Sequence, residues 1–216
     1  MRVTIVGGGV VGTAHAWQAV QRGHTVVQLE REVEARGATV RNFGLVWVSG
    51  RADHELEAAL RARELWEQIG EQVPGVGFRP AGSLTLLRSP REIAVAEQAS
   101  ARTDADRRGF SVLDPDQVRA INPALRGKFL AALHCSRDGA VESRQALPAI
   151  RAHLESTGRY TFVPGSEARS VDGGSCAMTV IAATAVTWCC CVRVRPTADS
   201  PGRWPAICPC AGCGCR

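Results

Sequence analysis

Hydrophobic and polar positions along the first thirty residues predict a strand, a helix and a second strand. Residues 2–6 are a run of mostly β-branched apolar side chains, residues 13–22 have the composition of a helix, and residues 25–29 are again mostly β-branched and apolar. Gly23 follows the helical stretch, as glycine often does after the last turn of a helix. The pattern therefore predicts a βαβ unit.

After this unit, predicted helices and strands follow one another in no regular order. An apolar stripe along residues 53–69 predicts an amphipathic helix, in which we expect Trp66 to belong to the core. Proline after a capping residue, with Glu or Gln three residues after the cap, predicts helix starts at Ser89 and Asp114. The first of these helices is expected to run toward Arg108. The remaining predicted elements are strands over 82–87, 129–134 and 160–163 and a helix over 147–158.

The turn between the first strand and the first helix has the spacing G-x-G-x-x-G. Gly7 permits the tight turn, Gly9 lets the backbone approach a pyrophosphate, and Gly12 lets the helix pack closely on the strand. The helix N-terminus supplies N–H groups and partial positive charge for phosphates. Glu30 ends the second strand at about the offset where an acid accepts hydrogen bonds from a ribose, and its charge disfavours NADP. Together these features indicate a dinucleotide site; a glycine-rich turn without a ligand is the alternative.

A second informative stretch comes shortly after the second strand. Residues 37–44 read GATVRNFG, and small, polar and glycine residues would let the backbone run along a long cofactor, past its pyrophosphate and toward a ring. Ordinary loop capping is the alternative explanation for Arg41 and Asn42. The hypothesis of a cofactor path therefore depends on the whole stretch and not on one side chain.

Composition and charge exclude several other functions. The chain of 216 residues has 26 basic and 21 acidic residues and no basic run with interleaved aromatics, so we expect no nucleic-acid partner. The five histidines are scattered without the spacing of metal ligands, so we expect no metal site from them. Residues 1–170 contain no apolar run long enough to cross a bilayer. We therefore expect a cytoplasmic protein without a membrane partner.

The two glycine-containing motifs together resemble one family. GGGVVG with Glu30 and Arg31, followed by GATVRNFG, is similar to the FAD-dependent amine and amino-acid oxidoreductases of the D-amino-acid oxidase and glycine oxidase type. It is most similar to a bacterial branch associated with aminophosphonate breakdown. NAD-dependent Rossmann enzymes lack the second motif. The resemblance implies an α/β fold, in which a Rossmann-like FAD-binding βαβ domain is interrupted by an α+β substrate domain, with FAD as the cofactor.

The resemblance also implies roles for individual residues. It assigns the adenosine end of FAD to Glu30 and Arg31, and it assigns a backbone contact with adenine to Ala168, on a strand over residues 165–171. The residues implied to hold the pyrophosphate are Gly7, Gly9, Val10, Val11 and Gly12. Those implied to line the path to the flavin are Thr39, Val40, Arg41 and Asn42.

The same resemblance implies domains and a reaction. FAD binding is assigned to residues 1–72 and 141–172, and part of the substrate domain to residues 73–140. A small neutral amine would lose its Cα hydrogen as hydride to the flavin, and the imine would then hydrolyse, so no catalytic side chain is assigned. In this family the residues that grip a substrate carboxylate or phosphonate lie mainly beyond residue 216. We therefore expect a chain that lacks the C-terminal half of its pocket and turns over poorly.

The composition changes in residues 173–216, which hold eight of the nine cysteines. One interpretation is a zinc site, although its four cysteines are more closely spaced than in most structural sites. Another is a membrane anchor over residues 173–192, weakened by its Ser, Thr and Cys content. The zinc ligands would be Cys208, Cys210, Cys213 and Cys215. If either interpretation holds, the alternative is a small zinc-binding or membrane-tethered protein. An NAD-dependent dehydrogenase is a further alternative.

A third interpretation is that this segment is translated out of frame. If each codon is read from its third base, Trp188 and the cysteines 189–191 necessarily encode Val-Leu-Leu. The neighbouring codons permit a proline, a glycine and an alanine after it, so the shifted frame resembles the strand and small-residue turn by which the family returns to its nucleotide domain. We therefore expect residues 173–216 to be aberrant, against the alternative of a genuine cysteine-rich tail.

Overall fold

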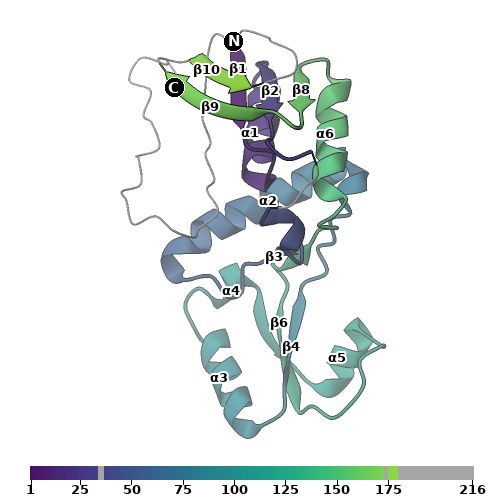
Figure 1. The fold of residues 1–216 in the computed structure, drawn as a ribbon. Helices are drawn as coiled ribbons and strands as arrows, with labels where there is room; N and C mark the ends of the chain where they lie inside the picture. Colours follow the sequence, from purple (N-terminus) through teal and green to yellow (C-terminus); the bar gives the residue numbers. More distant parts are fainter. Residues whose placement is uncertain (34–36, 173–174, 180–216) are drawn as a thin grey trace.

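The computed structural model describes residues 1–33, 37–172 and 175–179. Its first sheet has three parallel strands in the order β1-β2-β8, formed by β1 (Arg2–Val6), β2 (Thr25–Leu29) and β8 (Tyr160–Val163) (Figure 1). Val3 pairs with Val26, which in turn pairs with Tyr160. Two helices, α1 (Val10–Gln21) and α6 (Ala146–Ser156), lie beside this sheet.

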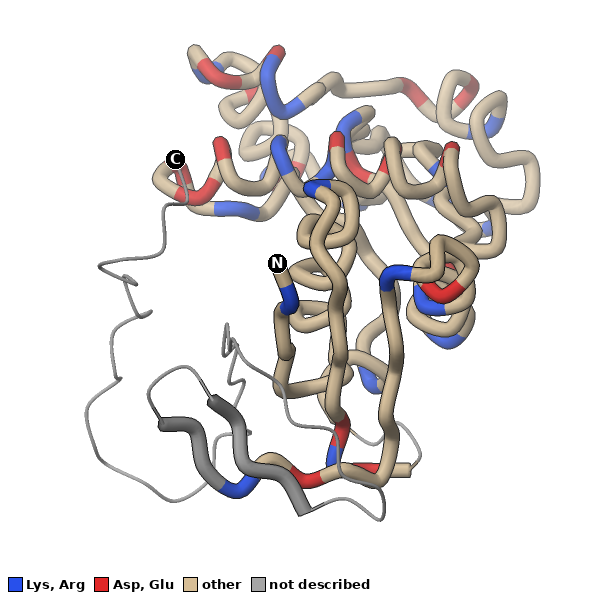
Figure 2. Tube along the Cα trace, turned by 90° about the horizontal axis from the view of Figure 1, so that it is seen from above, with Lys and Arg blue, Asp and Glu red and all other residues tan. Residues whose placement is uncertain are grey.

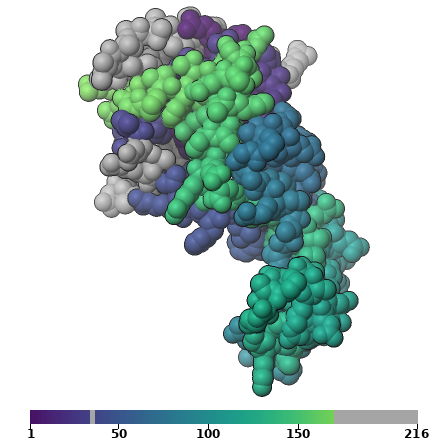
Figure 3. All heavy atoms as spheres, turned by 90° about the vertical axis from the view of Figure 1, so that its right-hand side faces the viewer, coloured from purple at the N-terminus to yellow at the C-terminus, as the bar shows by residue number. Residues whose placement is uncertain are grey.

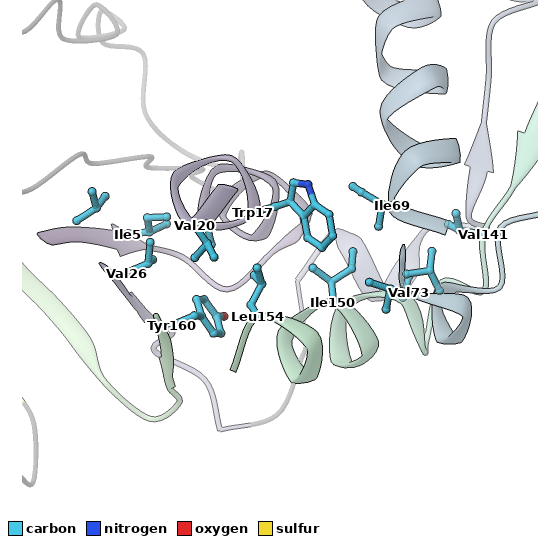
Figure 4. Close-up of a cluster of buried hydrophobic side chains, with 14 of the residues drawn as sticks. Ile5, Trp17, Val20, Val26, Ile69, Val73, Val141, Ile150, Leu154 and Tyr160 are labelled. Carbon is cyan, nitrogen blue, oxygen red and sulfur yellow. The ribbon is translucent and has the colours of Figure 1, made fainter. Parts of the chain in front are cut away.

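The main core lies between this sheet and three helices. Figure 4 shows Leu154 of α6 beside the strand residue Tyr160, and Trp17 of α1 opposite Ile150 of α6. Ile69 extends the same cluster to α2 (Leu56–Gln72), whose polar face is exposed. Burial of one side chain of this size contributes roughly 1.5–3 kcal/mol. The cluster therefore fixes α1, α2 and α6 around the start of the chain.

A second lobe is built on an antiparallel sheet in the order β4-β6-β5. On β6, Ala131 packs with one helix and Ala132 with another, because successive strand residues point to opposite faces. This lobe projects from the larger body (Figure 3). Its strands are β4 (Ser83–Leu87), β5 (Phe110–Leu113) and β6 (Ala131–Cys135), and its helices are α3 (Pro90–Ser100), α4 (Ala105–Arg108) and α5 (Pro115–Ile121).

Short elements complete the chain. Strand β3 (Leu45–Val46) pairs antiparallel with β7 (Gly139–Ala140) and so joins the first part of the chain to the end of the second lobe. A hairpin of β9 (Glu167–Asp172) and β10 (Ser175–Thr179) follows β8. Three 3₁₀ turns lie at η1 (Thr39–Arg41), η2 (Asp53–Glu55) and η3 (Pro74–Val76).

Most of the predicted elements are confirmed, with three corrections. The first helix begins at Val10, not residue 13, because Gly9 is already its extended N-cap. The helix expected to run from Ser89 toward Arg108 is wrong: α3 ends at Ser100, and α4 is separate. The C-cap of α3 is Ala101, and the turn that separates α3 from α4 contains Arg102 and Asp104, whose side chains pair at 2.8 Å. Strands β3, β5, β7 and β10 were not expected.

Of the tail, the structure describes only Ser175–Thr179 beyond residue 172, as strand β10. The cysteine cluster proposed as a zinc site and most of the proposed membrane anchor and shifted-frame segment lie outside the described residues. Within the described part, none of the helices has the length and apolar character required to cross a bilayer. Basic and acidic residues are interspersed along the described backbone (Figure 2).

Candidate dinucleotide site

The glycine turn has the geometry that its spacing predicts. Gly7 adopts φ 111° and donates its N–H to Leu29 O at 2.8 Å, which ties the turn to β2. A Cβ atom on Gly12 would lie only 2.1 Å from Gly7 O, so any side chain there would push the helix off the turn. Helix α1 has Gly9 as its N-cap, no side-chain cap and no acidic residue in its first turn. Its partial positive charge therefore remains available to an anion.

Buried polar side chains support the turn from β2 and β8. Gln28 is fully buried, and its Nε2 donates to Gly7 O at 2.8 Å. The hydroxyl of Tyr160 donates to Oε1 of the same amide. Burial raises the pKa of Tyr160, so its phenol stays protonated and remains a donor. The turn thus rests on two neutral, hydrogen-bonded side chains. The sequence analysis did not predict this support, although a glutamine within an apolar strand indicates a buried polar contact.

Glu30 lies at the mouth of the turn. Its Oε2 accepts the N–H of Gly8 at 2.7 Å, and its Oε1 accepts the N–H of Glu32 at 3.0 Å. Arg151 of α6 donates to Gly8 O and stacks over the ring of Phe162, with 3.9 Å between guanidinium carbon and centroid. Burial lowers the pKa of Arg151, an effect opposed by the nearby Tyr160 and Glu30. The half-buried Glu30 carboxylate is an acceptor placed beside the phosphate-binding end of α1.

The other residues assigned to the adenosine end are placed differently from one another. Arg31 is exposed and pairs with the neighbouring Glu32 at 3.1 Å. Ser166 donates its N–H to Glu30 O at 2.8 Å, which fixes the start of β9 beside β2. Ala168 lies on β9, half-buried, and pairs with Met178 of β10. The expected strand is therefore confirmed, but it belongs to a hairpin and not to the parallel sheet.

The second motif contacts the first. The Oγ1 of Thr39 accepts the N–H of Val10, at the first residue of α1, at 3.1 Å. Asn42 accepts the N–H of Gly44 through its Oδ1 at 3.0 Å, which is the loop capping considered as its alternative role. Gly44 has φ 77°, and a Cβ atom there would lie 2.2 Å from Val141 O. Val40 is half-buried and Arg41 is exposed.

A cleft of about 260 Å³ begins at this contact. It runs from Val10 at the start of α1 to Leu45 and Val46 of β3, so both motifs line it. Further apolar wall comes from Trp66 and Leu147, and polar atoms come from Thr39, Asn42 and Ser143. Trp66 is only partly buried, so it serves both the core and the cleft. An apolar slot with a few polar groups beside a helix N-terminus is typical of a cofactor site.

Comparison with known proteins agrees with this geometry. The model of the family described as "FAD dependent oxidoreductase" (DAO) matches residues 2–201. The chain belongs to this family. It is 28% identical to one of the opine oxidase subunits from Rhizobium meliloti over 168 residues, covering 72% of this chain and 45% of the relative. It is 31% identical to the putative thiamine biosynthesis oxidoreductase ThiO of Rhizobium etli over 160 residues, covering 72% and 46%. The chain therefore spans about half the length of these curated relatives.

Solved structures show the same fold. The glycine oxidase of Bacillus cereus ATCC 14579 matches with a TM-score of 0.68 at 21% identity, covering 87% of this chain and 54% of that one. The L-proline dehydrogenase of P. horikoshii matches with a TM-score of 0.68 at 20% identity, covering 82% and 49%. The expected FAD-dependent family and its mixed α/β fold are confirmed, and this family uses FAD.

Proposed function

We propose that this chain binds FAD at the glycine turn and belongs to an enzyme that oxidises an amine or amino acid. The observation that carries the proposal is the N-terminus of α1, where the N-cap Gly9 has no capping side chain of its own. Glu30 binds the Gly8 N–H on one side of it, and Thr39 binds the Val10 N–H on the other side, beside the cleft. When bound, FAD would supply the acceptor for a hydride. The chain's own residues would bind and orient it and exclude water.

The residues fit the parts of this cofactor in order. The backbone of residues 7–12 would hold the pyrophosphate, because a Cβ on Gly12 would close the turn and the N-cap Gly9 has no side chain of its own to occupy the helix end. Glu30 would exchange its bond to Gly8 for hydrogen bonds from ribose hydroxyls. Residues 39–42 would follow the cofactor, with Thr39 against α1, and the cleft beyond them would take the ring end. Arg31 and Ala168 complete the proposed adenosine end.

The domain division is part of the same proposal. Residues 1–72 and 141–172 would form the FAD-binding part, since they contribute the parallel sheet and the main core. Residues 73–140 would form part of the substrate domain, since they contain the separate antiparallel sheet with its own apolar clusters. The substrate would be a small amine beside a carboxylate or a phosphonate. Relatives named glycine oxidase and opine oxidase favour the amino-acid class.

Titration of the 216-residue chain with FAD and with ADP tests the binding proposal. We expect both to bind, because ADP contains the part of FAD that would contact the turn and Glu30. Glu30→Ala should weaken the binding of both ligands, because it removes the ribose acceptor. Glu71→Ala, at an exposed acid of α2, is the matched control. Isothermal calorimetry gives the affinities, and circular dichroism reports folding. A folded chain that binds neither ligand would refute the proposal.

Two other functions would give different results. A preference for NAD over FAD in the same titration would favour an NAD-dependent dehydrogenase. Stoichiometric zinc or recovery with membranes would favour a role for the cysteine-rich tail, whereas recovery in the soluble cytoplasmic fraction is what we expect. Among the described residues no group of three or more His, Cys, Asp or Glu is placed to hold a metal ion. Resequencing the DNA that encodes residues 170–195 tests the proposed change of frame.

A further inference from the structure

Asp138 is a buried carboxylate that the proposed function does not use. It lies between β6 and β7, and 1% of its surface is exposed. It accepts two backbone hydrogen bonds, from Val48 at 2.7 Å and Ser49 at 2.9 Å. It also accepts the hydroxyl groups of Ser49 at 2.7 Å and Ser83 at 2.6 Å. A side chain from the end of the second lobe therefore satisfies consecutive N–H groups about ninety residues earlier in the chain.

Arg108 binds the same segment, residues 48–51, with a charge opposite to that of Asp138. Its side chain is 4% exposed, and its Nη1 donates to Arg51 O at 2.7 Å and to Ser49 O at 3.3 Å. Its remaining donors bind Asp53 and Asp104. The segment after β3 thus has its N–H groups held by a buried carboxylate and its C=O groups held by a buried guanidinium. Both side chains come from the second lobe.

The anchored segment continues directly from the wall of the cleft. Along it, Leu45 is 50% and Trp47 44% exposed, whereas Val46 is 7% and Val48 0% exposed. The side chains of Val46 and Val48 therefore point into the core, and those of Leu45 and Trp47 point outward. A shift of one residue would exchange the two sets. The hydrogen bond from the Val48 N–H fixes the register at the buried end.

We propose that Asp138 is a positioning residue for the ring end of the cofactor site. By holding Val48 and Ser49, it stabilises the register in which β3 pairs with β7 and in which Leu45 and Val46 line the cleft. It touches neither the glycine turn nor Glu30 in the described structure, so its effect should be confined to the ring end. The inference rests on the proposed function, because it requires that FAD occupies both the turn and the cleft.

Comparison of FAD with ADP separates the two ends of the site. Asp138→Ala removes the acceptor of two buried N–H groups, so we expect FAD binding to weaken about tenfold while ADP binding changes less than about twofold. Asp138→Asn keeps an oxygen acceptor for the same N–H groups and should restore most of the FAD affinity. In wild type and in the asparagine variant, the absorbance bands of bound flavin should differ from those of free FAD. In the alanine variant they should resemble those of free FAD.

Controls distinguish positioning from general destabilisation. Asp116→Ala, at an exposed acid of the same lobe, should leave both affinities unchanged. If Asp138→Ala does not fold, Ser83→Ala is the substitute, because it removes one of the four hydrogen bonds that Asp138 accepts. It should still weaken FAD binding more than ADP binding. Equal weakening of both ligands, or no change in either, would refute the inference while wild-type binding upholds the proposed function. If the folded wild-type chain binds neither ligand, both fail.

Discussion

The glycine turn and the segment over residues 44–51 bound one cleft, yet different chemistry holds each in place. Beneath the turn, the neutral side chains of Gln28 and Tyr160 support Gly7, while Glu30 and Arg151 bind Gly8 at its mouth. The segment is held by the charged side chains of Asp138 and Arg108, which come from the second lobe. A neutral support is insensitive to pH, whereas a charged one couples the cleft to the folding and ionisation of another lobe. Substitutions in each support can test that difference.

The largest effect is expected at the turn itself. Gly12→Ala places a Cβ atom 2.1 Å from Gly7 O and 2.9 Å from the Nε2 of Gln28. Because these neighbours are backbone and a buried amide, we expect a loss of about 3 kcal/mol in the free energy of unfolding and no measurable binding of FAD or ADP. Urea unfolding and calorimetry measure the two quantities. Gln21→Ala, at the exposed last residue of the same helix, is the control and should resemble wild type.

The next effect separates two adjacent arginines. The Arg108 side chain is 4% exposed and binds two backbone carbonyls, whereas the Arg107 side chain is 54% exposed and pairs with Glu57. Arg108→Ala leaves two part-buried carbonyls and the Asp104 carboxylate without the donor that Arg108 supplies, so we expect a cost of about 2–3 kcal/mol. Arg107→Ala removes a surface ion pair and should cost less than about 1 kcal/mol. Equal unfolding midpoints in urea for the two variants would show that burial does not control this anchor.

This contrast also explains how much of the molecule could be predicted from its sequence. The βαβ unit, the turn and the capping boxes at Ser89 and Asp114 were predicted because each depends on residues within one turn or one strand. The elements that were missed depend on distant partners. Strand β3 forms only because β7 lies beside it, more than ninety residues later. No local pattern encodes such a pairing.

The candidate site follows the same rule. Gly7, Gly12 and Glu30 lie where their spacing predicted. For Asn42 the structure shows the loop cap that was considered as the alternative. Asp138 and Arg151 could not be found from the sequence, because an acid in an Asp-Gly turn and an arginine on an amphipathic helix are typical of exposed positions. Their partners are defined only once the chain has folded.

A double-mutant cycle tests the neutral support beneath the turn. Gln28→Leu removes the donor to Gly7 O and leaves the Tyr160 hydroxyl without its acceptor, so we expect a loss of about 2 kcal/mol in the free energy of unfolding. Tyr160→Phe alone leaves the amide oxygen of Gln28 unpaired and should cost about 1 kcal/mol. The double variant should lose less than the sum, because neither partner is then left unpaired. Strict additivity in urea unfolding would show that the two side chains act independently.

The smallest effect is the acid sensitivity of the charged support. Burial by itself would raise the pKa of Asp138, but hydrogen bonds from Ser83, Ser49 and Val48 outweigh it and hold the pKa below its ordinary value. A group with a lowered folded-state pKa stabilises the fold above its unfolded-state pKa, about 3.9 for aspartate. That contribution is lost as the pH falls through the folded-state pKa.

Comparison of wild type with Asp138→Asn between pH 7 and pH 3 isolates this contribution from those of the other carboxylates. The difference in unfolding free energy should be constant near neutrality and shrink below about pH 4, by about 1.4 kcal/mol for each unit of the pKa difference. Burial raises the pKa of the adjacent Cys135 to about 11, so its thiol stays neutral throughout. Gln28→Leu should show no such change relative to wild type, because neither Gln28 nor Tyr160 titrates in this range. A pH-independent difference for Asp138→Asn would mean that the two supports do not differ in their response to acid.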